Sequence, residues 1–414
     1  MDKYYFTTLP NGTRIVSEFV PYVKSFSIGF WFNVGARDEN TRNNGISHFI
    51  EHMVFKGTKR RTAKMIAEEI ESFGGYINAF TSKEHTCFYS KGLSNNIGKT
   101  FSVISDMIQN TLFRESHIKK EAGVVIDELK DLDDSPEELI YDKFEEIIFS
   151  GNTLSLPVIG REVNIKNFTS DTLFKYYNTN YKTKNLLIVA SGSVKHDQLI
   201  KLTEKYISQN KTRFNKTRDQ FKKRKASDLV FEKEIQQVHT IIGRAAPGYK
   251  DSKRILVRFL SALLGEGSSS RLFLAVREKL GITYQINSFL NSYYDASAFG
   301  VYFSTNSNQY DKVIDIVLRE FKKLKEKRVT ERELKKVKEY LRGGMLINLE
   351  NTTNRMMRMA NSILYYNKIV KIDEYLKKID NINADDLLRV ANESLNESQL
   401  IKVILKSVKV WKII

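Results

Sequence analysis

Residues 46–54 read ISHFIEHMV, and this stretch decides how the first half of the chain is organised. Its apolar side chains recur at the three- and four-residue spacing of a single helical face: Ile46, Phe49, Ile50, Met53 and Val54. Asn43 or Asn44 can cap the start of such a helix, and Gly57 can close its end. We therefore expect a helix that buries this face and leaves a polar face open.

The polar face of this helix carries His48, Glu51 and His52. Residues three and four apart share one face of an α-helix, so the three side chains project together. Imidazoles at this spacing suit zinc, and Glu51 beside them is placed to take a proton from a zinc-activated water. The order is inverted relative to the usual zinc-peptidase helix, in which the glutamate follows the first histidine.

The third ligand must come from elsewhere, because a hydrolytic zinc site has three protein ligands and a position for water. A carboxylate on a second helix is the preferred source. Glu121 and Glu128 are two helical turns apart, so both can face the same way. The spacing alone does not rank them, and it leaves Asp127 open as well.

The chain repeats itself once, after roughly 210 residues. HFIEHMV at residues 48–54 aligns with RFLSALL at residues 258–264, and INAF at 77–80 aligns with INSF at 286–289. The second copy keeps the apolar frame of the helix but lacks both histidines and the glutamate. This loss favours a metal site in the first copy over two histidines that are merely bonded to neighbouring groups.

The sequence pattern predicts strands at 26–34, 76–81, 84–93 and 186–194. The last of these has a partner in the second copy, at 400–408, and a helix is predicted at 62–73. The expected fold class is α+β, with two homologous domains related by pseudo-symmetry, each a mostly antiparallel sheet flanked by helices. We assign residues 1–210 to the first, catalytic domain, residues 211–228 to a basic linker and residues 229–414 to the second, non-catalytic domain.

Composition narrows the class of protein. The chain has 414 residues, a net charge of +17 and a single cysteine, Cys87, which excludes internal disulfides and suits a reducing compartment. No apolar run approaches the roughly 18 residues of a membrane span, so we expect a soluble, cytoplasmic protein. The stretch 121–146 is acidic and the stretch 211–225 is basic. The basic stretch lacks a base-stacking pattern, which favours a solvated linker over a nucleic-acid site.

Four segments resemble one known family: HFIEHMVFKGT, GGYINAFTS, EAGVVIDELKDLDDSPEE and SSRLFLAVREKLGITYQINSF. The chain resembles the pitrilysin and insulinase family of inverzincins, most closely the short-chain members related to mitochondrial processing peptidase. The resemblance implies one zinc ion per chain, bound by His48, His52 and Glu128, with Glu51 as the general base. It also implies that Glu121 orients a ligand without touching the metal.

The same resemblance implies residues that bind the substrate. Asn78 and Ala79 lie on an edge strand that would bind an extended peptide by strand addition. Arg277 and Tyr284 match the pair with which the non-catalytic half grips the substrate backbone; an ion pair to a neighbouring glutamate and a core position are the alternatives. Phe55 is expected to line the pocket beyond the scissile bond, with ordinary core as the competing interpretation.

The function expected from the resemblance is a zinc metalloendopeptidase that hydrolyses peptides or unfolded segments, including processing-type cleavage. Chains of this length in the family are expected to close as a homodimeric clamshell or to pair with a related subunit. Two rival interpretations are a non-catalytic assembly subunit, which should have lost metal ligands, and a nucleic-acid-binding protein that uses the basic linker.

Overall fold

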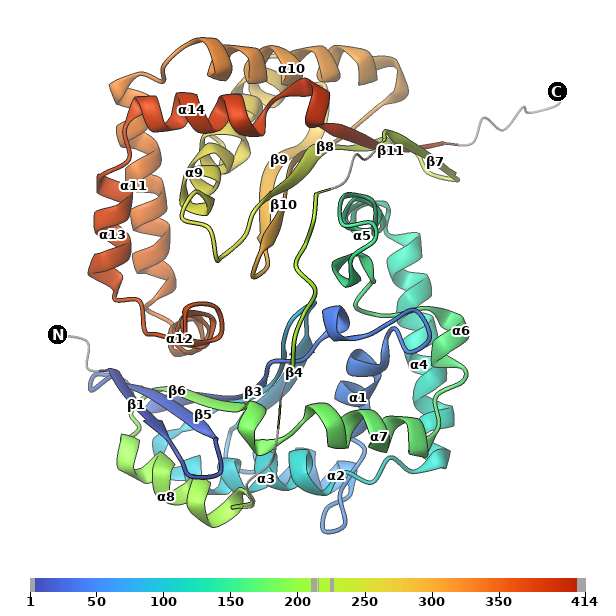
Figure 1. The fold of residues 1–414 in the computed structure, drawn as a ribbon, viewed down its shortest axis with the longest axis vertical. Helices are drawn as coiled ribbons and strands as arrows, with labels where there is room; N and C mark the ends of the chain where they lie inside the picture. The colour runs from blue at the N-terminus through green and yellow to red at the C-terminus, as the bar shows by residue number, and fades with distance from the viewer. Residues whose placement is uncertain (1–3, 210–213, 215, 224–226, 408–414) are drawn as a thin grey trace. The chain divides into compact units, whose positions relative to one another are not determined.

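The computed structural model describes residues 4–209, 214, 216–223 and 227–407 (Figure 1). These residues form two compact units, each with one sheet and its helices. The first unit comprises Met1–Lys130, Leu156–Asp219 and Leu346–Val370, and the second comprises Asp131–Ser155, Gln220–Met345 and Lys371–Ile414. The α+β class expected from the sequence is confirmed. No helix within the described ranges combines the length and the apolar character needed to span a bilayer.

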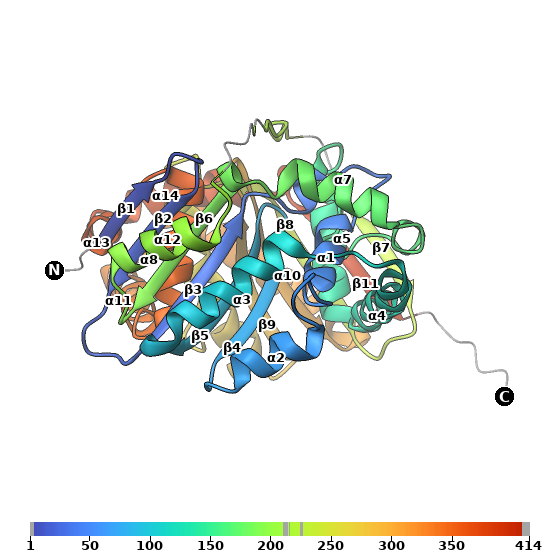
Figure 2. The same ribbon diagram turned by 90° about the horizontal axis from the view of Figure 1, so that it is seen from below.

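The first sheet has the strand order β1-β2-β6-β3-β5-β4 (Figure 2). Its strands are β1 Tyr4–Thr8, β2 Arg14–Phe19, β3 Ser25–Phe32, β4 Tyr76–Thr81, β5 Thr86–Leu93 and β6 Leu186–Gly192. The pair β2–β6 is parallel and the other pairs are antiparallel. The long connections between these strands carry most of the helices of this unit, and β4 forms one edge of the sheet.

The second sheet repeats this topology in the order β7-β11-β8-β10-β9. Its strands are β7 Leu229–Lys233, β8 Val238–Pro247, β9 Thr283–Ser292, β10 Ala296–Thr305 and β11 Ile401–Ser407. The order matches the order from β2 to β4 in the first sheet strand for strand. The parallel pair here is β7–β11, the counterpart of β2–β6, and the other pairs are antiparallel. The internal repeat expected from the sequence is therefore confirmed at the level of topology.

The helices flank these sheets. Those of the first unit are α1 Ile46–Val54, α2 Ala63–Glu71, α3 Ile97–Asn110, most of α4 Glu115–Asp134, α6 Glu162–Ile165, α7 Ser170–Asn180, α8 His196–Tyr206 and α12 Thr352–Tyr366. Those of the second are α5 Pro136–Ile148, α9 Arg254–Gly265, α10 Tyr310–Glu326, most of α11 Glu331–Asn348, α13 Ile372–Asp380 and α14 Ala384–Ser394. In the aligned sequences, α9 is the counterpart of α1.

Each sheet buries a helix from the other half of the sequence. In the first unit, Met356 and Ile363 of α12 pack on Trp31 and Val189, on the face opposite α3 and α8 (Figure 1). In the second unit, α5 packs on the sheet face that carries Ile241 and Val403 through Phe144 and Ile148. The ranges 1–210 and 229–414 thus describe the strands of each sheet, whereas the compact units also exchange two helices.

The start of α1 differs from the expectation. Neither Asn43 nor Asn44 is its N-cap; Gly45 is, with a positive φ of 98°. The buried carboxylate of Glu39 takes the capping role, accepting hydrogen bonds from the backbone N–H of Gly45 at 2.7 Å and of Ser47 at 2.8 Å. Its negative charge also suits the positive end of the helix dipole. The amide of Asn44 donates to the same carboxylate at 2.9 Å.

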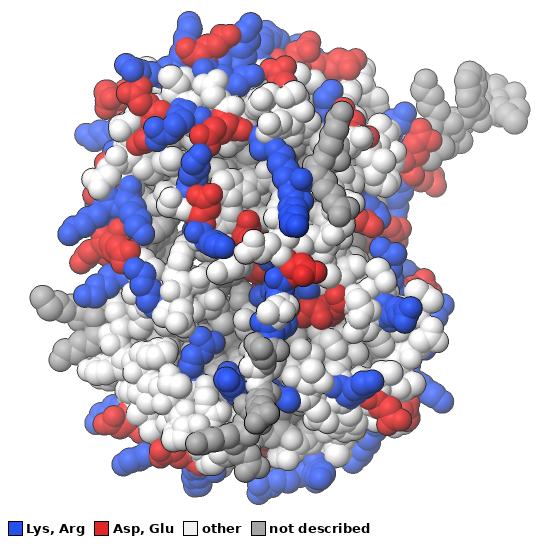
Figure 3. Space-filling view, viewed as in Figure 1, with Lys and Arg blue, Asp and Glu red and all other residues white. Residues whose placement is uncertain are grey.

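The basic linker is also only partly as expected. The stretch includes residues outside the described ranges, but Lys216 and Arg218 are described, and they are not solvated: both form ion pairs with the buried Asp38. The prediction of a solvated segment was therefore wrong for these two residues. On the face drawn in Figure 3, basic side chains lie interspersed with acidic ones.

Two glycines hold the start of α1 against the loop before α6. A Cβ added to Gly160 would lie 2.4 Å from the Cα of Gly45 and 2.7 Å from the carbonyl oxygen of Asn44, both of them backbone atoms. Gly160 also has a positive φ of 91°. Any larger residue there would push the start of α1 away from this loop.

We predict that Gly160→Ala destabilises the protein by about 2–4 kcal/mol, because the left-handed backbone and the backbone clash add to one another. Gly74→Ala is the matched control: Gly74 also has a positive φ, but a Cβ there meets nothing within 4 Å. We expect the control to cost only about 1 kcal/mol. Chemical denaturation measures both, and equal losses would contradict the close-packing argument.

Candidate metal centre

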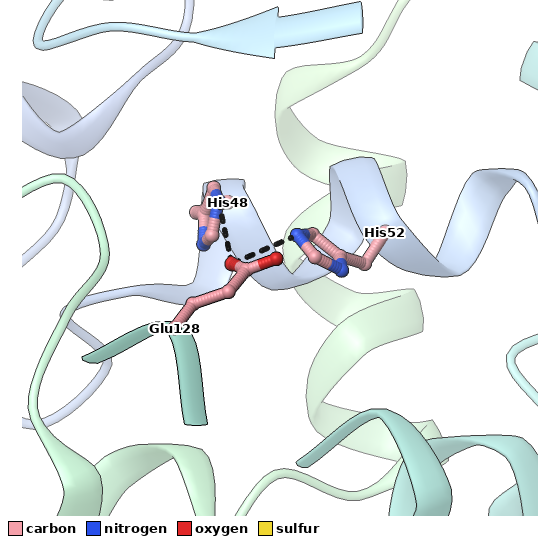
Figure 4. Close-up of side chains that lie close together, drawn as sticks. All are labelled: His48, His52 and Glu128. Atoms are coloured by element: carbon pink, nitrogen blue, oxygen red, sulfur yellow. Dashed lines mark ion pairs between the residues drawn. The ribbon is translucent and has the colours of Figure 1, made fainter. Parts of the chain in front are cut away.

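Two helices bring the predicted ligands together. His48 and His52 project from α1, and Glu128 approaches them from α4 (Figure 4). The Oε2 atom of Glu128 lies 3.8 Å from Nε2 of His48 and 3.5 Å from Nε2 of His52. One potential ligand atom from each residue lies within 4.8 Å of those of the other two. The three side chains thus point at a common position.

This geometry fits a zinc ion. Ligand atoms about 2.0–2.1 Å from a tetrahedral zinc are separated by about 3.3 Å, close to the two nitrogen–oxygen distances observed here. These distances are also longer than a hydrogen bond, so direct bonding between the side chains does not explain the arrangement. Two imidazoles and one carboxylate form the donor set of hydrolytic zinc sites that keep a position for water.

His48 has the protonation state that a metal ligand needs. Burial, helped by the neighbouring His52, lowers the pKa of His48 to about 4. The imidazole is therefore neutral near pH 7, with a lone pair available on one nitrogen. Its other nitrogen, Nδ1, is buried and has no hydrogen-bond partner among the described residues.

Glu121 lies behind His52 rather than beside the three converging atoms. Its Oε2 is 3.5 Å from Nδ1 of His52, on the side of the ring facing away from Glu128. Its Oε1 forms an ion pair with Lys56 at 2.7 Å. The Glu121 side chain is 3% exposed and that of Glu128 is 43% exposed, so only Glu128 combines convergence with access. The orienting role of Glu121 stays a prediction; its side chain contacts the ring of His52 and not the three converging atoms.

Glu51 is held by a residue of the neighbouring sheet. The hydroxyl of Thr81, the last residue of β4, donates to Oε2 of Glu51 at 2.6 Å. Burial raises the pKa of the Glu51 carboxyl to about 7; the Thr81 hydrogen bond opposes the shift and the charge of Glu128 adds to it. A carboxyl group with such a pKa can both accept and return a proton near neutral pH.

The predicted peptide-binding strand is an edge strand. β4 pairs with β5 on one side only, and it contains Asn78 and Ala79. The amide of Asn78 donates to the hydroxyl of Tyr76 at 2.6 Å, while its oxygen accepts from the N–H of Ala79 at 2.8 Å. The side chain of Asn78 thus occupies a backbone donor that an added strand would use.

The other predicted substrate-binding residues have separate environments. Phe55 is the C-cap of α1 and its ring lies 6.3 Å from that of Phe88. Arg277 lies in the π-helical segment Phe273–Glu278. Its side chain is exposed, and its guanidinium group lies over the ring of Phe273. Tyr284 is 74% exposed, which excludes the core position considered as its alternative. Arg277 and Tyr284 belong to the second unit, and their substrate role stays a prediction.

Sequence reasoning missed three residues of this site: Glu39, Lys56 and Thr81. Lys56 could have been predicted, because it follows His52 by one helical turn and can reach the same neighbouring helix. Thr81 and Glu39 could not, since each reaches α1 from another segment through a contact that depends on the tertiary fold.

Two family models match the chain in succession. The model described as Insulinase (Peptidase family M16) matches residues 14–162, and the model described as Peptidase M16 inactive domain matches residues 167–341. The first range contains all five residues predicted around the metal. The second contains the copy of the repeat in which both histidines and the glutamate are replaced.

Similar proteins and structures extend over nearly the whole chain. An uncharacterized zinc protease of Rickettsia bellii is 32% identical and covers 97% of this chain and 98% of its own. The uncharacterized zinc protease YmxG of Bacillus subtilis is 32% identical, covering 96% of this chain and 97% of its own. The crystal structure of a protease from Helicobacter pylori matches with a TM-score of 0.92 at 26% identity, covering 98% of this chain and all of that one.

A peptidase M16 inactive domain from Pseudomonas fluorescens has a TM-score of 0.91 at 16% identity and covers 99% of this chain and 98% of its own. At that identity the match supports the fold alone.

We predict that Glu128→Gln lowers zinc affinity by more than about 100-fold, because it removes a ligand, whereas Glu121→Gln lowers it by about 10- to 100-fold. Asp127→Asn is the control: Asp127 is exposed and paired with Lys130, and its loss should leave zinc affinity unchanged. Competition with a chromophoric chelator measures all three. A larger loss from Glu121→Gln than from Glu128→Gln would reverse the assignment.

Proposed function

Since the chain belongs to peptidase family M16, the insulinase family, we propose that it is a zinc-dependent metalloendopeptidase. One observation carries the proposal: His48, His52 and Glu128 converge at ligand distances while Glu51 lies on the same helix face. The rival assembly subunit should have lost these ligands, and this chain has kept them. The nucleic-acid alternative loses support, because Lys216 and Arg218 of the basic stretch are engaged in ion pairs.

In this proposal each residue has a separate task. His48, His52 and Glu128 would hold the zinc ion, which, when bound, polarises the scissile carbonyl and activates water for attack. Glu51 takes the proton of the attacking water and returns it to the leaving amine. Thr81 fixes one oxygen of Glu51, which leaves the other oxygen for the proton.

The proposed substrate is a peptide or an unfolded segment in extended conformation. Such a segment can add to the edge of β4, where its backbone would exchange hydrogen bonds with residues around Asn78 and Ala79. For this, the side chain of Asn78 must first release the N–H of Ala79. Phe55 would contact a substrate side chain beyond the scissile bond. Processing-type cleavage, one zinc ion per chain and a cytoplasmic location stay predictions that rest on the family resemblance.

We predict that Glu51→Gln retains zinc but lowers kcat by about 10²- to 10⁴-fold, since only the proton acceptor is removed. Hydrolysis of a quenched peptide library, measured with the zinc content of the same sample, tests this. Glu71→Gln, the same chemical change at an exposed position on α2, is the control. Chelation should abolish wild-type turnover and added zinc should restore it; an active Glu51→Gln enzyme would refute the assignment.

We also propose that the chain works as a homodimer in which Arg277 and Tyr284 act on the zinc site of the partner chain. The support is the family resemblance together with the exposure of both side chains. Guanidinium and phenol groups can donate hydrogen bonds to a peptide carbonyl. Pairing with a different, related subunit is the alternative arrangement.

A mixing experiment tests the dimer. Glu51→Gln and Arg277→Ala should each be inactive alone, but a mixed dimer contains one site with both wild-type residues. If subunits exchange at random, the mixture should regain up to about a quarter of wild-type activity. Sedimentation verifies that dimers form. Exchanging dimers that regain no activity would show that Arg277 does not act across the interface.

A further inference from the structure

A buried cluster of charges fastens residues 216–218, which belong to the segment that connects the two sequence halves, to the first unit. We call Asp38, Glu84, Lys216 and Arg218 the linker clamp. Arg218 contacts both oxygens of Asp38 through Nε and Nη2 at 2.8 Å, and its Nη2 also donates to the carbonyl oxygen of Glu84 at 2.7 Å. Lys216 donates to the carbonyl oxygen of Asn33 at 3.1 Å and pairs with Asp38.

One arm of the clamp leads to α1, which carries His48 and His52. Asp38 accepts a hydrogen bond from the N–H of Gly35 at 2.9 Å, which fixes the short loop after β3. The next residue, Glu39, is the buried carboxylate that caps α1 through Gly45 and Ser47. His48 follows Ser47 directly. The position of Asp38 therefore influences the position of His48, the first proposed metal ligand.

The other arm leads to the general base. Glu84 lies in the turn between β4 and β5, and its carboxylate accepts from Arg37 at 2.7 Å. The backbone of this turn also bonds the loop after β3, because the N–H of Arg37 donates to the carbonyl oxygen of Lys83 at 2.7 Å. The strand entering the turn ends at Thr81, which holds Glu51.

From the connecting segment, Arg218 contacts both arms, through Asp38 and through the carbonyl oxygen of Glu84. Its contact with Asp38 is two-pronged, and its side chain is only 16% exposed, so the fork is both directional and shielded from solvent. A lysine or a neutral amide cannot make the same pair of parallel bonds. The loop and the turn are also joined through Arg37. Loss of the fork would therefore remove one of several ties and let both segments shift slightly.

We infer that Arg218 is a positioning residue for the metal centre. It couples the connecting segment to α1 through Asp38, and to Glu51 through the turn that contains Glu84. The inference rests on the proposed function for the role of Glu51, but its metal-binding arm does not require turnover. Nothing in the sequence pattern distinguishes Arg218 from the other basic residues around it.

The test uses the full chain with Arg218→Gln. Arg218 does not touch a metal ligand, so its effect should be smaller than that of a residue that does, for which losses of about 10- to 100-fold are typical. We expect zinc affinity to fall by about 5- to 10-fold. In turnover assays kcat should fall while KM stays within about two-fold, since Arg218 contacts the turn after β4 and neither Asn78 nor Ala79. Arg218→Lys keeps the charge without the fork, and we expect it to recover only part of the affinity.

Arg355→Gln is the matched control. Arg355 is 13% exposed and forms a comparable ion pair at 2.5 Å with Glu18 in the same unit, but on β2, away from α1. It should lower the melting temperature and leave zinc affinity unchanged. An Arg218→Gln affinity within two-fold of wild type, or an equal loss in Arg355→Gln, overturns the inference.

The visible absorption spectrum of the cobalt-substituted protein adds a readout of ligand geometry. It should change in Arg218→Gln but not in Arg355→Gln. If Arg218→Gln does not fold, Arg218→Lys carries the same comparison. A chain that binds zinc normally but hydrolyses nothing would refute the proposed peptidase while leaving the affinity comparison valid.

Discussion

A buried carboxyl group at the N-terminus of α1, that of Glu39, holds the helix that carries the proposed metal ligands. A helix that starts inside a protein leaves backbone N–H groups without partners, and a buried carboxylate is costly unless it is hydrogen-bonded. Glu39 and the first turn of α1 satisfy each other in this way. Burial raises the pKa of Glu39, and the hydrogen bonds from Gly45 and Ser47 oppose that shift. The orientation of α1 fixes both histidines and Glu51.

The duplication separates scaffold from chemistry. Both copies build a sheet with the same strand order, and both place a helix at the same point, α1 in one and α9 in the other. Only α1 keeps imidazoles on its polar face. In α9 the position of His52 is occupied by Ala262, which is buried in the core of its own unit. A fold can thus preserve its packing while the site is retained in a single copy.

The sequence allowed prediction of the features that depend on local spacing. His48, Glu51 and His52 followed from helical periodicity, and β4 was placed with its observed limits. Glu128 could not be chosen over Glu121 from the residues alone, because both lie on one helix and only its approach to α1 separates them. Periodicity does not encode contacts between residues that are far apart in the sequence. Such contacts determine the role of Glu39, the ion pairs of Lys216 and Arg218, and the exchange of α5 and α12.

The exchange of helices has a consequence for biosynthesis. The first sheet is complete once β6 has left the ribosome, but the face that carries Trp31 and Val189 is covered by a helix made more than a hundred residues later. Until then, the nascent chain exposes an apolar surface of the kind that promotes aggregation or recruits chaperones. Neither half of the gene would therefore encode an independent folding unit.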